Sequence, residues 1–188
     1  MASHGKFSGN PRTEWLEDSS SSDRDMSLLE KFSFTDPDGR DWLAPKGSVV
    51  NGASIPQPLW SIVGSPYTDD YRRASVVHDV ACNTAGVKRK EADVMFFHAC
   101  RAGGCGPVQA RILYAGVRLG AWASKSLTQQ SISREALLYR DWKDGLSPES
   151  LFLQSKLSEI SKDMESIPPE QEPTIAELDS IIRRHVRI

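Results

Sequence analysis

Residues 69–102 read DDYRRASVVHDVACNTAGVKRKEADVMFFHACRA, and this stretch decides the fold. Apolar residues recur at helical spacing on both sides of a break at Thr84-Ala85-Gly86-Val87. The pattern predicts one helix over 69–83 and a second helix over 88–102. Because the connection between them is short, we expect the two helices to pack antiparallel.

Three polar residues stand out inside this apolar pattern. His78 and Asp79 interrupt a run of small aliphatic residues, and Asp93 lies in a similar run on the second helix. Asp79 and Asp93 are each seven residues from Gly86, so they lie at the same height in an antiparallel pair. A buried carboxylate needs a partner. We therefore expect Asp93 to lie within hydrogen-bond reach of the His78 ring.

This pairing supports a mechanism. A carboxylate bound to one ring nitrogen fixes the tautomer of a histidine and leaves the other nitrogen to act as a general base. Asp93 would orient His78, and His78 would activate a water molecule. The spacing is equally compatible with a buried polar cluster whose role is to fix the register of the two helices.

A cation site is expected beside this pair. Asp79 leaves the helix in a different direction from His78, and it could hold Ca²⁺ or another divalent cation. Further ligands would come from the loop at Asn51 and Gly52, with Ser54 beside them. The cation would polarise an ester or phosphoryl oxygen. Cys82 is a further candidate residue of the site.

The rest of the chain predicts a small β element and more helices. Asp36-Pro37-Asp38-Gly39 is a turn signal, and we expect a hairpin of Phe32–Thr35 with Arg40–Ala44. A third extended piece covers Ser48–Val50, and the polar residues 1–26 hold at most one short strand. Helices are also expected over 107–123, 131–145, 149–165 and 175–186. The fold class is α+β, mostly α, with a small N-terminal β-hairpin or sheet packed on a helical body that contains the antiparallel pair.

The predicted organisation has three parts. Residues 1–26 form a polar segment, residues 27–130 a core domain, and residues 131–188 a helical extension with a linker near 166–174. The extension carries apolar stripes at helical spacing, which normally pack against something. They are Leu151, Leu153, Leu157 and Ile160, then Ile175, Leu178, Ile181 and Ile182. We expect them to pack on the chain's own core; the alternative is a carrier or a neutralising immunity protein.

Composition excludes some classes of protein. The 188 residues carry a formal net charge of −2, which gives no support to a nucleic-acid binder. No apolar run is long enough for a membrane span, and the N-terminus has no apolar core of a signal peptide. We expect a protein that is cytoplasmic as synthesised and that needs a signal-peptide-independent route if it is exported. Three cysteines are too few for a disulfide framework, but a Cys82–Cys100 bridge between neighbouring helices stays open.

An ordered set of motifs resembles the DUF1353 family of small bacterial and phage proteins, which has no established common activity. The motifs are Trp42-Leu43-Ala44-Pro45-Lys46-Gly47, Asn51-Gly52-Ala53-Ser54-Ile55-Pro56, Trp60, Tyr71-Arg72-Arg73-Ala74, Val77-His78-Asp79, Glu91-Ala92-Asp93-Val94-Met95-Phe96 and Tyr114-Ala115-Gly116-Val117-Arg118. The resemblance covers about residues 30–122. The family usually has Asp where this chain has Asn51, and an aromatic residue commonly follows the His-Asp pair where this chain has Ala81 and Cys82.

The two helices also resemble the catalytic helices of secreted phospholipases A2. That resemblance implies His78 as the base, Asp93 as its orienting partner and Asp79 as a calcium ligand, although the paired cysteines and glycine-rich calcium loop of those enzymes are absent. We therefore expect a hydrolase, first of all a lipid esterase with a lipid or cell-envelope substrate, in the manner of an exported toxin. One alternative is a peptidoglycan or peptide amide hydrolase with the same dyad. The other is a non-enzymatic, phage-derived accessory or interaction protein.

Overall fold

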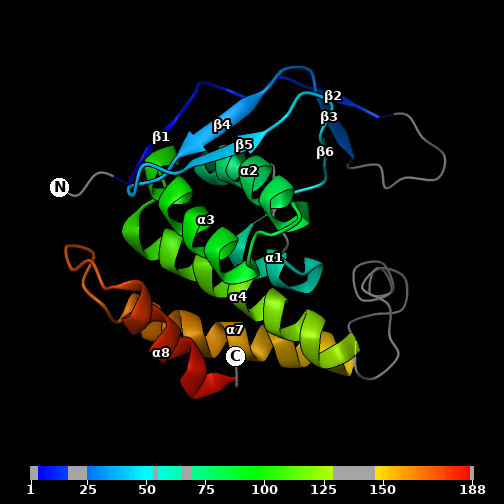
Figure 1. Cartoon of the computed structure of the whole chain (residues 1–188). Coiled ribbons are helices and arrows are strands. Elements are labelled where there is room, and N and C mark those ends of the chain that lie inside the picture. The colour runs from blue at the N-terminus through cyan, green and yellow to red at the C-terminus, as the bar shows by residue number, and fades with distance from the viewer. Residues whose placement is uncertain (1–3, 17–24, 53–54, 65–68, 129–146, 187–188) are drawn as a thin grey trace. The chain divides into compact units, whose positions relative to one another are not determined.

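A computed structural model of the chain describes residues 4–16, 25–52, 55–64, 69–128 and 147–186 (Figure 1). The chain divides into two compact units. The first consists of Met1–Ser54 and Pro66–Cys105, and the second of Ile55–Ser65 and Gly106–Ile188. The predicted class, α+β and mostly α, is confirmed: helices make up most of the described residues, and the described strands all lie in the first unit.

The first unit contains two small antiparallel sheets among the described residues. One sheet has the order β1-β4-β5, with β1 at Lys6–Phe7, β4 at Phe32–Thr35 and β5 at Asp41–Ala44. The other has the order β2-β3-β6, with β2 at Thr13–Trp15, β3 at Met26–Leu28 and β6 at Val49–Val50. The sheets therefore interleave in sequence, because β4 and β5 lie between β3 and its partner β6.

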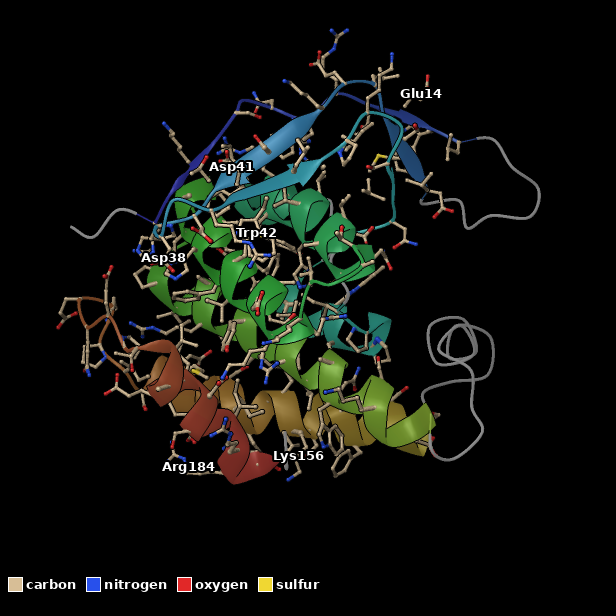
Figure 2. The ribbon with its side chains drawn as sticks, in the orientation of Figure 1. Glu14, Asp38, Asp41, Trp42, Lys156 and Arg184 are labelled. Carbon is tan, nitrogen blue, oxygen red and sulfur yellow. The ribbon has the colours of Figure 1, made fainter. Side chains whose placement is uncertain are left out.

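The hairpin of β4 and β5 follows from an alternating pattern and a strong turn. Phe34 pairs with Trp42, and both side chains are buried, whereas the neighbouring Asp41 is exposed on the opposite side of the strand (Figure 2). The Asp36 carboxylate accepts hydrogen bonds from the backbone N–H groups of Asp38 and Arg40 at 3.0 and 2.9 Å. It also accepts one from the Trp42 indole at 2.8 Å, so the turn is tied to the strand that follows it.

The two helices predicted from residues 69–102 are present. A 3₁₀ turn, η2 at Asp69–Tyr71, leads into α2 at Arg72–Asn83, and α3 spans Arg89–Gly103. Gly86 adopts φ 81° in the connection, a conformation that favours glycine. Gly104 ends α3 in the left-handed region, and the Cys105 N–H donates to the Cys100 carbonyl at 3.0 Å. Tyr71 precedes α2 without a side-chain cap.

One expectation for the first unit was wrong. Residues 1–26 contain β1, β2 and the first residue of β3, where the sequence indicated at most one short strand. These strands are two or three residues long, too short to show an alternating pattern of their own. Their hydrogen bonds come from pairing, of β1 with β4, of β2 with β3 and of β3 with β6, so the strands depend on tertiary contacts rather than on local propensity.

The second unit is helical. It comprises η1 at Gln57–Leu59, α1 at Trp60–Val63, α4 at Pro107–Thr128, α7 at Pro148–Glu165 and α8 at Ile175–His185. The helix predicted over 107–123 is thus five residues longer than expected, and the one over 131–145 lies outside the described residues. Thr174 and Glu177 form a capping box that begins α8.

The apolar stripes of α7 and α8 are buried, as predicted for packing within the chain. Leu153, Leu157 and Ile160 are buried on α7, and Leu178 and Ile182 on α8. Leu151 is exposed, because the buried stripe of α7 begins at Ser150 and Leu153 on the neighbouring face. The Tyr114 hydroxyl on α4 donates to the Asp179 carboxylate on α8 at 2.7 Å. The last helix therefore docks on α4 of its own unit.

A buried arginine holds the segment that precedes α8. The Arg111 side chain on α4 is 1% exposed, and its guanidinium donates to four backbone carbonyls. They belong to Met164, Ile167, Pro168 and Gln171. These bonds fix the Pro168-Pro169 linker against α4. The domain boundaries predicted at residues 26 and 130 remain a prediction.

No helix among the described residues is long and apolar enough to cross a membrane.

Candidate functional site

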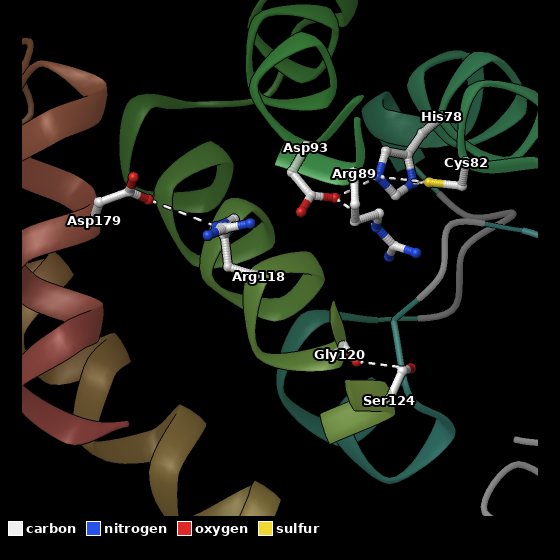
Figure 3. A network of polar contacts seen from close by, with 8 residues as sticks. All are labelled: His78, Cys82, Arg89, Asp93, Arg118, Gly120, Ser124 and Asp179. Carbon is white, nitrogen blue, oxygen red and sulfur yellow. Dashed lines mark hydrogen bonds and ion pairs between the residues drawn. The ribbon is translucent and has the colours of Figure 1, made fainter. Parts of the chain in front are cut away.

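The antiparallel helices of the first unit bring four polar side chains together, as Figure 3 shows. His78 and Cys82 are one turn apart on α2, and Arg89 and Asp93 are one turn apart on α3. The helical pattern of residues 69–102 therefore determines which side chains share a face. The short connection then brings the two faces against each other.

The predicted bond between His78 and Asp93 is present. Nε2 of His78 lies 2.9 Å from Oδ1 of Asp93, with the ring N–H as donor because an ionised carboxylate accepts only. Both side chains are 0% exposed. Nε of Arg89 donates to the same oxygen at 3.0 Å. Asp93 is thus a buried carboxylate held by two donors.

The ring of His78 is also fixed from its other sides. Its centroid lies 4.7 Å from that of the buried Phe96 ring. Sγ of Cys82 lies 3.5 Å from Nε2 and 3.8 Å from Nδ1. Cys82 is partly exposed, in contrast to the ring that it touches. The histidine is therefore buried, and the cysteine is the neighbour that reaches the surface.

The charges of the cluster favour a protonated ring. Burial lowers the pKa of His78, but the negative charge of Cys82 and the hydrogen bonds to Asp93 and Cys82 raise it more, to about 9. Burial raises the pKa of Asp93. Its hydrogen bond to His78 and the charges of His78 and Arg89 nevertheless hold that pKa below the ordinary 3.8. At neutral pH the pair is an imidazolium and a carboxylate.

Asp79 points away from this pair. Its Oδ2 accepts a hydrogen bond from the backbone N–H of Asn51 at 2.8 Å. Asp79 and Gly52 are buried, Asn51 is exposed, and Ser54 lies outside the described residues. His78, Asp79 and Asp93 therefore do not converge on one point, because successive side chains leave a helix about 100° apart. The loop meets Asp79 through an N–H, and the calcium site stays a prediction.

Within the described residues, the structure groups a different set of metal-type ligand atoms. The candidate atoms of His78, Cys82 and Asp93 all lie within 4.8 Å of one another. A thiol and an imidazole suit a softer ion than calcium, which prefers oxygen ligands. Arg89 beside Asp93 opposes a further positive charge there. The cluster therefore fits proton transfer better than cation binding.

Sequence reasoning found His78 and Asp93 but missed two features of the site. It did not include Arg89, although the four-residue spacing to Asp93 on one helix would have indicated the ion pair. It named Cys82 without placing it on the His78 ring, which the same helical spacing could have predicted. The Cys82–Cys100 bridge is not formed, and all three cysteines are free thiols. Burial and a hydrogen bond with Cys105 raise the pKa of the Cys100 thiol well above its usual range.

Comparisons with known proteins place this site in a family. The model of DUF1353, "Protein of unknown function", matches residues 26–117. The uncharacterized protein y4jT of Sinorhizobium fredii is 37% identical over 114 residues, which cover 60% of this chain and 33% of that protein. The uncharacterized protein y4iH of the same organism is 36% identical over 90 residues, which cover 48% of this chain and 38% of that protein.

The chain thus spans about a third of the length of the curated relatives that it matches. No solved structure gives a significant match. The matched region contains all of α2 and α3, and with them the whole His78–Asp93 cluster. Residues 26–117 are thus the part of this chain that is similar to the DUF1353 family.

Proposed function

We propose that the chain is a hydrolase in which the His78–Asp93 pair performs the proton transfers, and that its first substrate class is a lipid ester. The observation that carries the proposal is the 2.9 Å bond between two side chains that are 0% exposed. Burial of a polar side chain costs free energy unless the side chain is hydrogen-bonded, and the bond to Asp93 meets this need for His78. Pairing with a carboxylate is the arrangement that general acid–base catalysis needs.

The chemistry of the pair supports this proposal. Asp93 fixes Nε2 as a proton donor, so Nδ1 is the nitrogen that gives its proton to a leaving group and takes one back from water. Arg89 keeps Asp93 ionised, so the carboxylate orients the ring without taking its proton.

The choice of a lipid ester rests on the resemblance to secreted phospholipases A2. There, too, a histidine followed by an aspartate faces a second aspartate on an antiparallel helix. Asp79 follows His78 here, and Asp93 lies on the opposing helix. This likeness is an analogy between sites rather than between folds.

A second candidate function is favoured by the burial of the ring. Because His78 has no solvent-exposed surface, the cluster could serve as a polar contact that fixes the helix pair of an interaction module. The two candidates differ in what His78→Gln does. It removes catalysis in a hydrolase, and in an interaction module it lowers stability alone.

The test measures hydrolysis of three substrate classes by the full chain: phospholipid vesicles with a fluorogenic acyl chain, soluble short-chain esters, and peptidoglycan fragments. We expect His78→Gln to lower the turnover by about 10³-fold or more, and Asp93→Asn to cost less, because the base remains without its orienting charge. His98→Gln, a half-buried histidine on α3, is the matched control. An intact wild type that turns over none of the three classes, with a lower melting temperature in His78→Gln, supports the interaction module instead.

A further inference from the structure

We propose that Cys82 is the nucleophile of this hydrolysis, so that the reaction passes through a thioester on Sγ. This inference rests on the proposed function and adds the attacking group.

The first support is geometry. Sγ lies 3.8 Å from Nδ1 of His78, the nitrogen that Asp93 leaves unoccupied, and 3.5 Å from Nε2. The spacing of four residues on one helix keeps the thiol against the ring. A nucleophile, a base and an orienting carboxylate in contact are the three parts of a cysteine-based catalytic site.

The second support is access. The His78 ring is 0% exposed, whereas Cys82, which touches it, is partly exposed. The other two cysteines are buried, Cys100 at 0% and Cys105 at 1% exposed. Cys82 is therefore the cysteine that a substrate carbonyl can meet from the surface, with the ring directly behind it.

The third support is the environment of the sulfur. The His78 ring lies against the sulfur, with Nδ1 3.8 Å from Sγ, and a neighbouring histidine of this kind is the setting in which catalytic cysteines are found. The hydrogen bond from Nε2 to Asp93 holds the ring in place beside the sulfur. The cluster thus brings the sulfur, the ring and the carboxylate into contact.

The steps balance with water as the only co-reactant. Sγ of Cys82 attacks the carbonyl carbon, a C–S bond forms, and the bond from that carbon to the leaving oxygen or nitrogen breaks. The leaving group takes the proton of the His78 imidazolium. Water then attacks the thioester, gives one proton to His78, and releases the carboxylic acid and the thiolate. The substrate class is therefore an acyl ester or amide, and phosphoryl esters are not expected.

The first experiment needs no substrate. The native full chain is treated with iodoacetamide at pH 7, and alkylation of each cysteine is followed by mass spectrometry. We expect Cys82 to react about tenfold faster than glutathione, because the His78 ring lies against its sulfur, while the buried Cys100 and Cys105 stay protected. His78→Gln should return Cys82 to the rate of an ordinary thiol, and His98→Gln should leave it unchanged. A Cys82 rate at or below that of glutathione in the folded wild type overturns the proposal, whether or not His78→Gln folds.

The second experiment separates this inference from the proposed function. With an acyl ester that the wild type hydrolyses, Cys82→Ser should lower the turnover by about 10²-fold or more, and rapid quenching of the wild type should trap an acyl group on Cys82. If Cys82→Ser retains turnover while His78→Gln loses it, the nucleophile is overturned. In that case the hydrolase stands, with water as the attacking group.

Discussion

The two units each bury a polar cluster, and the partners of the two clusters differ. In the first unit, His78 and Asp93 bond to each other, with Cys82 and Arg89 beside them. In the second unit, Arg111 donates to four backbone carbonyls of the segment around Pro168. Backbone carbonyls do not titrate within the pH range of proteins, whereas a histidine, a cysteine and an aspartate do.

This difference shows what a buried polar group indicates about function. Burial with hydrogen bonds is needed in both clusters, because an unsatisfied polar group inside a protein is costly. The first cluster contains a histidine and a cysteine, the side chains whose ordinary pKa values lie nearest to neutral pH. The second cluster, which includes the bond from Tyr114 to Asp179, joins helices that are distant in sequence. We therefore assign chemistry to the first unit and a structural role to the second.

Removal of residues 168–188 should have the largest effect on stability. It deletes α8, exposes the surface that Leu178 and Ile182 cover, and takes away two of the carbonyls that Arg111 holds. Burial of two large aliphatic side chains contributes about 4 kcal/mol, so the melting temperature should fall by several degrees or more. Calorimetry of the truncated chain measures this change. An unchanged melting temperature would mean that α8 is a partner-binding element after all.

Arg111→Met should have the next largest effect. The side chain is 1% exposed, and its loss leaves four carbonyls without their donor, which should cost about 3 kcal/mol. Urea unfolding measures the loss, with the exposed Arg183→Ala as control. The alkylation rate of Cys82 should stay the same, because the cluster of the first unit does not include Arg111. A slower Cys82 reaction in a folded Arg111→Met would contradict the division of roles between the two units.

The pH dependence of stability should show the His78 pair. Burial lowers the pKa of His78 in the folded chain, but the interactions with Cys82 and Asp93 outweigh burial and raise this pKa from 6.5 to about 9. A raised pKa contributes stability that is fully present below pH 6.5 and is lost as the pH rises through about 9. Melting temperatures measured between pH 6 and 10 should therefore fall with pH in the wild type. The fall should be smaller in His78→Gln and unchanged in His98→Gln; equal slopes in wild type and His78→Gln would contradict the raised pKa.

Thr174→Ala should have the smallest effect. It removes the hydroxyl that accepts the Glu177 N–H at 3.3 Å and so breaks the capping box of α8. Loss of an N-cap costs about 1 kcal/mol. Chemical unfolding should detect this loss, and Cys82 should react as before. A loss of stability as large as that of Arg111→Met would show that the capping box, rather than the hydrogen bonds of Arg111, holds α8 in place.

The fold of the first unit was predictable where the local pattern is strong. The helices of residues 69–102, their antiparallel packing and the bond from His78 to Asp93 follow from periodicity, a short glycine turn and the need to pair a buried carboxylate. The strands β1 and β2 were not predictable, because two or three residues show no period and depend on their partners.

The site itself was predictable in part, for a related reason. Spacing along one helix shows which residues share a face, but it does not show the direction in which a side chain turns. Asp79 was expected to face the loop at Asn51 and Gly52, and in the structure it does meet this loop, but through the N–H of Asn51 rather than through a shared cation. The burial of Arg111 and its bonds to the segment before α8 could not be predicted, because these partners are backbone carbonyls more than fifty residues away.

The most direct test of the central claim is the protonation state of His78 itself. Nitrogen-15 NMR of the imidazole, assigned with His78→Gln, reports the protonation of both ring nitrogens as the pH is raised. We expect the ring to be charged at pH 7, with a midpoint near 9 that falls in Asp93→Asn. A ring that is neutral at pH 7 and indifferent to Asp93→Asn would contradict the account, since Nδ1 would then carry no proton to give to a leaving group.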